Sequence, residues 1–130
     1  MVNLHPVFVL LLMLFCHIVD DYYLQGWLAN GKQKSWWEKV APDKLYRFDY
    51  IMALGCHAFS WSFMIMLPIA ITTNWNMGWL FLAYPINMVI HAIVDDLKAN
   101  RHKINLIVDQ SIHFLQIGIT FLIYCLLYII

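Results

Sequence analysis

Charged residues are scarce in this chain. Asp, Glu, Lys and Arg make up 12% of the 130 residues, while hydrophobic residues make up 62%. Soluble domains carry about 25% charged and about 45–50% apolar residues, so this composition excludes an ordinary soluble domain and predicts a membrane protein. The length allows a single domain covering residues 1–130. The formal net charge is zero, so no basic surface points to a nucleic-acid partner.

Cysteine and signal-peptide features are also missing. The three cysteines stand singly in apolar stretches, with no CxxC pair and no even-numbered set. This pattern excludes a disulfide framework and a thiolate zinc site, and is typical of small buried side chains.

No Lys or Arg precedes the first apolar stretch, and no small-residue cleavage motif follows it. We therefore expect no cleavable signal peptide.

Long apolar segments dominate the rest of the sequence. We expect four helices, over about residues 2–24, 50–73, 75–96 and 105–130. Each is close to the roughly 20 residues that a membrane-spanning helix needs. The turn after the second segment is very short, which predicts an antiparallel hairpin. The sequence thus predicts an all-α integral membrane protein, a four-helix up-down-up-down bundle.

The basic residues predict an orientation. All of them lie in two loops, after the first and the third apolar segments: Lys32, Lys34, Lys39, Lys44, Arg47, Lys98, Arg101 and Lys103. Because cytoplasmic loops are enriched in Lys and Arg, we expect both loops in the cytoplasm and both termini outside, in a bacterial inner membrane. The loop over residues 26–49 mixes these lysines with aromatic residues, which is typical of a segment lying on lipid headgroups. Whether it also forms a lid or a lipid-head site stays open.

Ionisable residues interrupt the apolar segments in a repeated pattern. They form His17-x3-Asp21, a single His57, His91-x3-Asp95 and Asp109-x3-His113. Such residues cost roughly 2.5–3.5 kcal/mol each at mid-membrane, so they indicate a function. Spacing of four residues places each pair on one helix face. In an up-down bundle all these positions fall in one layer near the cytoplasmic face. We therefore predict a metal site with ligands from His17, Asp21, His57, His91, Asp95, Asp109 and His113.

The donor types narrow the choice of metal. Four imidazoles and three carboxylates exceed one tetrahedral zinc site, so one or two divalent ions are expected. Nitrogen and oxygen donors without thiolates favour zinc, with manganese or iron as alternatives. Neighbouring polar residues on the same faces are expected to support the ligands or to contact substrate: Gln25, Asn87, Lys98 and Gln110. We expect the two glutamines to donate to ligating carboxylates.

Carboxylate-rich ligation favours hydrolysis over oxygen activation. The sequence has no HExxH, GxSxG or P-loop motif, and no eight-histidine desaturase pattern. We hypothesise a metal-dependent hydrolase acting on a lipid-like ester, amide or phosphate at the cytoplasmic leaflet. A metal-activated water would be the nucleophile, and Asp21 or Asp109 the general base.

Other functions remain open at this stage. A carrier of ions or metal, a phage factor that binds and blocks a host membrane process, and a purely structural hydrogen-bond network all fit the pattern. A homo-oligomer is also left open.

The order of these motifs supports a resemblance over nearly the whole chain. The motifs are the run from His17 to Asp21 with Gln25 and Lys32, then Gly55-Cys-His57, His91-x3-Asp95-x2-Lys98, and Asp109-Gln110-x2-His113. Together they resemble the uncharacterised phage and bacterial membrane family known as domain of unknown function 3307. The resemblance implies no activity. It implies that these residues belong to a shared pattern, and it adds Lys32 to the supporting or substrate-contacting residues.

Overall fold

A computed structural model describes residues 4–75 and 78–130, and every regular element in these ranges is a helix. The long helices are α1 (Pro6–Val19), α4 (Asp49–Thr72), α5 (Leu80–Ala99) and α6 (Leu106–Tyr128). A π-helical turn, η1 (Asp20–Leu24), continues α1, and three short helices precede α4: α2 (Leu28–Gly31), α3 (Lys34–Val40) and the 3-10 turn η2 (Lys44–Tyr46). The prediction of an all-α chain is confirmed for the described residues.

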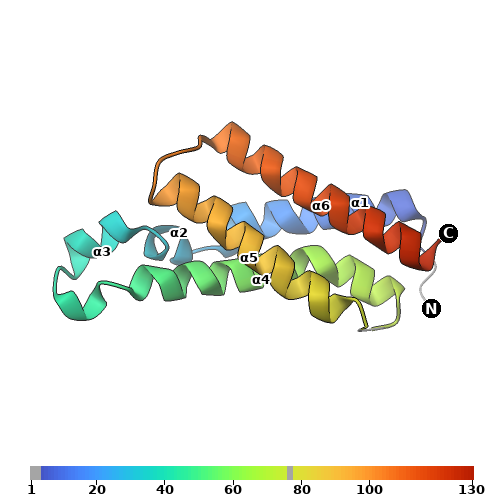
Figure 1. Cartoon of the computed structure of the whole chain (residues 1–130), viewed down its shortest axis with the longest axis horizontal. Helices are drawn as coiled ribbons and strands as arrows, with labels where there is room; N and C mark the ends of the chain where they lie inside the picture. The colour runs from blue at the N-terminus through green and yellow to red at the C-terminus, as the bar shows by residue number, and fades with distance from the viewer. Residues whose placement is uncertain (1–3, 76–77) are drawn as a thin grey trace.

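The four long helices lie side by side along the long axis of the molecule (Figure 1). α4 packs against α1 and α5, and α6 packs against α5 and α1. The start of α1 and the end of α6 lie at one end of the molecule, and α2 and α3 lie at the other (Figure 1). Residues from all four long helices can therefore meet at a single depth.

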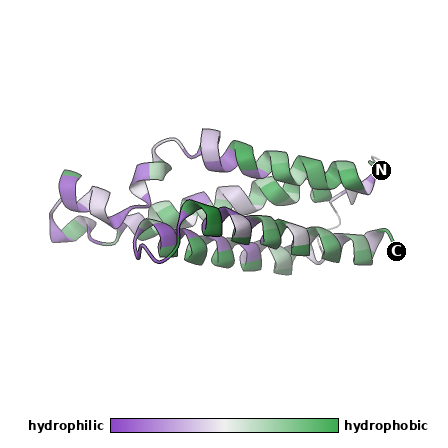
Figure 2. Ribbon diagram, turned by 90° about the horizontal axis from the view of Figure 1, so that it is seen from above, coloured by the Kyte–Doolittle hydropathy of each residue, from purple (hydrophilic) through white to green (hydrophobic). Residues whose placement is uncertain are grey.

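Three stretches are long and apolar enough to cross a membrane, which is consistent with a membrane protein: Pro6–Leu24, Lys44–Thr72 and Leu106–Tyr128. α5 is not among them, and its final turns carry Asp95, Asp96 and Lys98. The outward-facing side chains of the long helices are mostly apolar, and hydrophilic residues concentrate toward the α2–α3 end (Figure 2). Such a surface suits lipid better than water.

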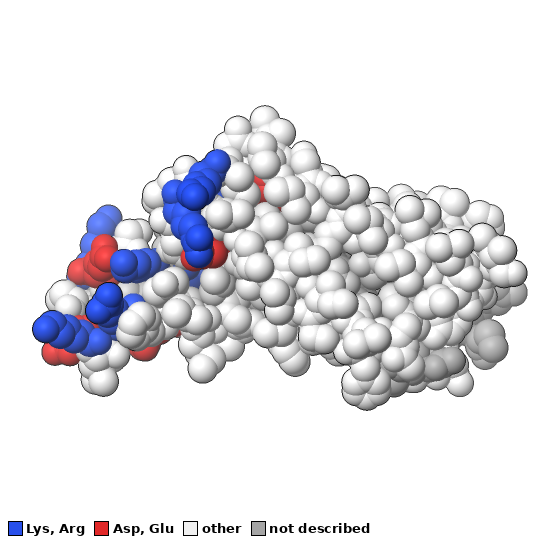
Figure 3. All heavy atoms as spheres, viewed as in Figure 1, with Lys and Arg blue, Asp and Glu red and all other residues white. Residues whose placement is uncertain are grey.

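Charge is confined to the same end. Lys and Arg side chains gather over α2, α3 and the α5–α6 connection, while the opposite end is free of them on the visible face (Figure 3). The two basic loops are therefore on one side of the molecule, as expected for an up-down arrangement. Inside the uncharged half, the helices pack through a buried apolar cluster that includes Val9, Met13, Ile65, Ile69 and Ile117.

The connection before α5 corrects the predicted boundary of the third helix. That helix was expected from residue 75, but α5 begins at Leu80. Asn74 and Trp75 have positive φ angles of 52° and 58°, a backbone conformation that ends a right-handed helix and cannot begin one. Residues 76–77 of the predicted helix lie outside the described part of the chain. The reversal of the chain after α4 needs this turn, so the third helix begins later than its apolar segment.

The segment over residues 26–49 is more ordered than the predicted interfacial loop, since it contains α2, α3 and η2. It is fastened to the end of α5: Asn100 donates its side-chain amide to the Lys32 carbonyl at 3.1 Å and accepts from the Lys34 amide at 2.7 Å. Gly31 lies so close to Trp27 that a Cβ there would stand 2.9 Å from the indole ring. This packing holds Lys32 at the polar end of the bundle.

Candidate metal centre

The change from α1 to a π-turn decides which residues of the first span face inward. In the wider turn η1, Asp20 and Asp21 are both buried, at 1% and 8% exposure. Consecutive residues of an α-helix point about 100° apart, so sequence reasoning selected Asp21 from its spacing to His17 and missed Asp20. The adjacent Asp-Asp pair at the end of an apolar span was the available signal, because π-turns are frequent at functional sites.

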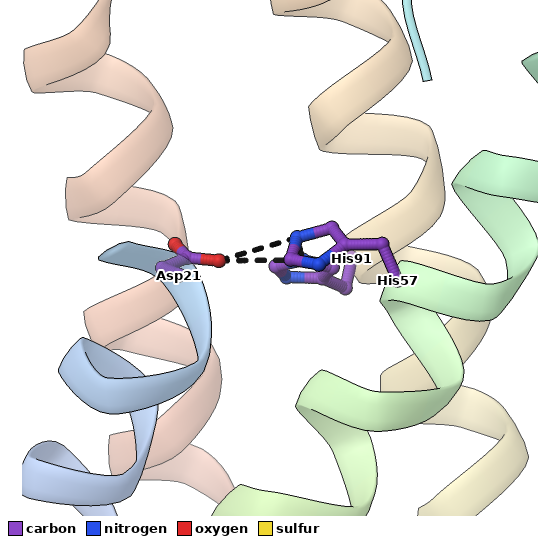
Figure 4. Close-up of side chains that lie close together, drawn as sticks. All are labelled: Asp21, His57 and His91. Carbon is purple, nitrogen blue, oxygen red and sulfur yellow. Dashed lines mark hydrogen bonds and ion pairs between the residues drawn. The ribbon is translucent and has the colours of Figure 1, made fainter. Parts of the chain in front are cut away.

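Four atoms from three elements, η1, α4 and α5, converge at the centre of the site. His57 Nε2 lies 3.1 Å from His91 Nε2, and 3.3 Å from both Asp21 Oδ1 and Asp95 Oδ2. His91 Nε2 lies 3.9 Å from each of the same two carboxylate oxygens. Asp21, on η1, faces the rings of His57 and His91 on α4 and α5 (Figure 4). Ligands of a tetrahedral zinc, at about 2.0–2.1 Å from the metal, are about 3.3–3.4 Å apart. The observed spacings bracket that value.

His113 extends the cluster on the side of α6. Its Nε2 lies 3.5 Å from Asp95 Oδ1 and 3.5 Å from Asp109 Oδ1. Within the described residues, two overlapping groups could hold an ion: Asp21 with His57 and His91, and His91 with Asp95 and His113. Of the seven predicted ligands, five belong to these groups, and Asp109 borders the second one.

Two lysines enter the site. Lys32 Nζ contacts Asp95 Oδ2 at 2.5 Å, and its side chain is 9% exposed. Lys98 Nζ contacts Asp109 Oδ2 at 2.6 Å, with 30% of the side chain exposed. Both had been predicted to support the ligands or to contact substrate, and the structure shows each bound to a carboxylate of the cluster. Lys98 is the more accessible of the two.

His17 belongs to a hydrogen-bond chain. Trp61 Nε1 donates to its Nδ1 at 2.8 Å. Because an indole N–H only donates, Nδ1 accepts, and the proton is on Nε2, 3.0 Å from Gln110 Oε1. The Gln110 amide then donates to Asp21 and Asp109, both at 3.1 Å. Both nitrogens of His17, a predicted ligand, therefore bind protein groups.

The supporting residues divide into two kinds. Gln110 donates to carboxylates as predicted, whereas Gln25 donates to the backbone carbonyl of Asp21. Asn87 lies one turn from His91 and binds Gln116 and Thr120 at 2.8 and 3.1 Å, forming a separate polar cluster. In an α-helix, the carbonyl of Asp21 would accept from the main-chain N–H four residues later. In the π-turn the side-chain amide of Gln25 donates to that carbonyl, and so it stabilises the turn.

Sequence reasoning also missed Trp61. It is fully buried, donates to His17, and stacks on the His91 ring with centroids 4.1 Å apart and 16° between planes. The available signal was its position one turn after His57, on the same face of the helix. Trp61 therefore contacts both the polar cluster and the apolar core.

Several buried polar atoms of the site have no hydrogen-bond partner among the described residues. They include Asp21 Oδ1, Asp109 Oδ1, His57 Nδ1, His91 Nδ1 and both ring nitrogens of His113. Buried polar groups are almost always partnered. Unpartnered carboxylate oxygens that face imidazole nitrogens are the donor set expected of a site for a divalent cation.

An open groove reaches the site from the side. It has a volume of about 510 Å³, between η1 and the first turns of α6. Its lining is apolar or aromatic apart from one amide: Ile18, Tyr22, Tyr23, Leu106, Ile107, Gln110 and Phe114. Because Gln110 also binds Asp21 and Asp109, it lies between the groove and the cluster.

Comparison with protein-family models, curated proteins and solved structures gives no match. The resemblance to domain of unknown function 3307 therefore stays a prediction.

Proposed function

We propose that the protein is a membrane-embedded metalloprotein that holds one divalent ion, with zinc as the first choice and manganese or iron as alternatives. The ligands are Asp21, His57, His91 and Asp95. The observation that carries this proposal is that two imidazole nitrogens lie 3.1 Å apart, and that each lies 3.3 to 3.9 Å from one oxygen of Asp21 and one oxygen of Asp95.

Charge balance supports a single ion. The buried carboxylates of the cluster are Asp20, Asp21, Asp95 and Asp109, and the ammonium groups bound to them are those of Lys32 and Lys98. With neutral imidazoles, as metal ligation requires, the cluster carries two excess negative charges. One divalent cation neutralises them. An uncompensated charge at this depth would be costly.

We further propose that α1 with η1, α4, α5 and α6 form a four-helix up-down-up-down bundle in a bacterial inner membrane, with both termini outside. The basic residues gather at one end of the molecule (Figure 3), which supports a cytoplasmic position for that end. α5 then crosses the membrane with its charged turns at the cytoplasmic face. Reporter fusions at Ile130 and near Lys39 test this, and a cytoplasmic signal from Ile130 would reverse the orientation.

The reaction we propose is metal-dependent hydrolysis of an amphiphilic lipid. An ion that took a water as a fifth ligand beside the four protein ligands would lower the pKa of that water towards about 7 and would supply a nucleophile at neutral pH. Asp21 is committed to the ion, so Asp109 is the better candidate for the general base. Asp109 Oδ1 lies 3.5 Å from His113 Nε2 and has no hydrogen-bond partner among the described residues, while Oδ2 accepts from Lys98 and Gln110.

The lateral groove gives this substrate a route. Its lining residues lie on outward surfaces of two candidate spans, so a lipid chain would enter from the bilayer without crossing water. The chain would lie against Tyr22 and Ile107, and the polar head would meet Gln110 beside Asp109. A lipid ester, amide or phosphate fits this path equally well.

Metal analysis and turnover test the proposal together. Protein purified without chelator should contain one equivalent of transition metal. In nanodiscs of total bacterial lipid it should release a product seen by mass spectrometry. Asp109→Asn should keep the metal and slow product release by at least about 100-fold. Glu38→Gln is the matched control, and it should change neither, since the Glu38 side chain is 64% exposed and pairs only loosely with Lys34 at 3.8 Å. Wild-type protein without metal would overturn the proposal.

A non-enzymatic role is the second candidate, and the complete burial of His57, His91 and His113 favours it. Such a site could retain an ion without exposing it to substrate. One equivalent of metal with no lipid product would support a binding or blocking protein. Metal flux into liposomes would support a carrier.

A further inference from the structure

A charged cleft lies between α3 and η2, outside the metal centre. It has a volume of about 220 Å³, and it shares no lining residue with the lateral groove or with the His and Asp cluster. Its lining includes Lys34, Lys44 and Arg47, at the end of the molecule where Lys and Arg side chains gather (Figure 3). Neither the proposed ion nor the proposed hydrolysis uses this cleft.

The turn η2 places two of these cations on one face. Lys44 begins this 3-10 turn and Arg47 is its C-cap residue, with the Arg47 amide donating to the Lys44 carbonyl at 3.3 Å. Side chains three residues apart in a 3-10 helix lie directly above one another. The Arg47 guanidinium also lies over the Phe48 ring, 5.2 Å from its centroid. The two cations are therefore presented side by side.

The acidic residues of the cleft are already engaged elsewhere. The Glu38 carboxylate pairs with Lys34 at 3.8 Å, and Asp43 Oδ1 accepts from the Leu45 amide at 2.8 Å, which caps η2. Neither Lys44 nor Arg47 has an ion pair with a carboxylate among the described residues. Arg and Lys bind phosphate through charge-assisted hydrogen bonds, and a guanidinium can bind two phosphate oxygens at once. A phosphate group therefore complements this pair of cations.

The surroundings favour a phosphate that belongs to a lipid. Leu45 and Phe48, which adjoin the two cations in the sequence, are 76% and 61% exposed. Trp37 and Tyr46 stack in the cleft, with ring centroids 6.4 Å apart and 14° between the planes. The candidate span Lys44–Thr72 begins at the same point. Basic residues mixed with aromatic and apolar ones are typical of the membrane interface, where acyl chains would cover the exposed apolar side chains.

We propose that this cleft binds the headgroup of an anionic phospholipid of the surrounding bilayer. The phosphate lies between Lys44 and Arg47, and the acyl chains lie beside Leu45 and Phe48. The bound lipid holds the segment over residues 26–49 on the membrane. The inference rests on the membrane placement in the proposed function, but it depends on neither the metal nor the hydrolysis.

Native mass spectrometry of the full-length protein in detergent micelles measures the binding of single lipid molecules. Phosphatidylglycerol is compared with phosphatidylcholine of the same acyl chains, whose ammonium group offsets the phosphate charge. We expect the wild-type protein to prefer the first phosphatidylglycerol by about 30-fold in Kd, since each of two basic residues near a membrane contributes roughly fivefold. Equal Kd values for the two lipids would overturn the proposal.

A pair of double variants separates the cleft from the general surface charge. Lys44→Gln with Arg47→Gln should abolish the preference. Lys39→Gln with Lys103→Gln is the matched control, because it removes the same charge from exposed side chains outside the cleft and should keep the preference. All four side chains are exposed, so both variants should retain the helical circular dichroism of the wild-type protein. An equal loss in the two variants would show diffuse attraction and overturn the site.

Inorganic phosphate tests the source of the ligand. A large excess of phosphate, compared with acetate at equal ionic strength, should leave phosphatidylglycerol bound to the wild-type protein. Displacement by phosphate would show that the cleft takes the free ion, which overturns the assignment to a lipid. The metal content is an independent readout, because the cleft contains none of the proposed ligands. Wild-type protein without metal retires the metal centre and leaves the lipid site standing.

Discussion

The two halves of the helical assembly are equally buried but held together differently. In the half near the chain ends, Val9, Ile65 and Ile69 have no exposed surface and contribute no polar side-chain atoms. In the other half, His57, His91 and Asp95 are as deeply buried, and several polar atoms of their cluster have no hydrogen-bond partner among the described residues. The first half is held mainly by apolar contacts. The second is suited to a bound cation.

This difference shows where the free energy of each half comes from. Close packing stabilises the apolar half, because dispersion contacts are lost wherever a side chain is shortened. The polar half depends on mutual compensation of charge, which fails when one partner is removed. Variants in the two halves should therefore respond differently to truncation and to metal.

Removal of Asp95 should give the largest effect. Asp95→Ala leaves Lys32 buried without its carboxylate and takes one partner from His57 and from His113. We expect a loss of about 3–5 kcal/mol in the free energy of unfolding, measured in mixed detergent micelles. Glu38→Ala, at a side chain that is 64% exposed, should stay within about 0.5 kcal/mol. Equal losses in the two variants would show that the site is not charge-compensated.

Metal should stabilise the polar half selectively. Zinc at about 100 times its Kd should raise the free energy of unfolding of the wild-type protein by about 2.7 kcal/mol, because it binds only the folded site. Excess chelator should remove this gain. An unfolding curve that is identical with zinc and with chelator would contradict a metal centre and leave a hydrogen-bonded network.

Trp61 connects the two halves and should give an intermediate effect. Trp61→Phe keeps most of the ring but removes the donor to His17 Nδ1, leaving a buried acceptor unpaired. We expect a loss of about 1–3 kcal/mol in the same unfolding measurement. Trp79→Phe is the control, since the Trp79 indole N–H has no partner among the described residues and its removal should cost less. A larger loss at Trp79 would show that ring packing dominates.

Ile69 tests the apolar half alone. Ile69→Val removes one buried methylene and should cost about 0.5–1.5 kcal/mol. The stabilisation by zinc should equal that of the wild-type protein, since the site is untouched. If the zinc effect fell together with stability, the two halves would not be independent.

The sequence by itself determined the helical class, the long apolar helices and the placement of His and Asp along their faces. These follow from local rules: apolar length defines a candidate span, and spacing of four residues defines a face. The positions of His91 and Asp95, or of Asp109 and His113, were readable in this way. Their convergence at one depth was predicted on the assumption that successive helices alternate in direction.

Tertiary structure alone decided which atoms meet. Asp20 is held in the core by Ser60, 40 residues along the chain, and Lys32 binds Asp95, 63 residues along the chain. The same holds for His17, whose spacing to Asp21 suggested a ligand until Trp61 and Gln110 were seen to engage both nitrogens. The turn at Asn74 that delays α5 is closed by local main-chain hydrogen bonds, which apolar periodicity does not predict. Periodicity specifies the direction of a side chain along its own helix, but its partner is set by the packing of the other helices.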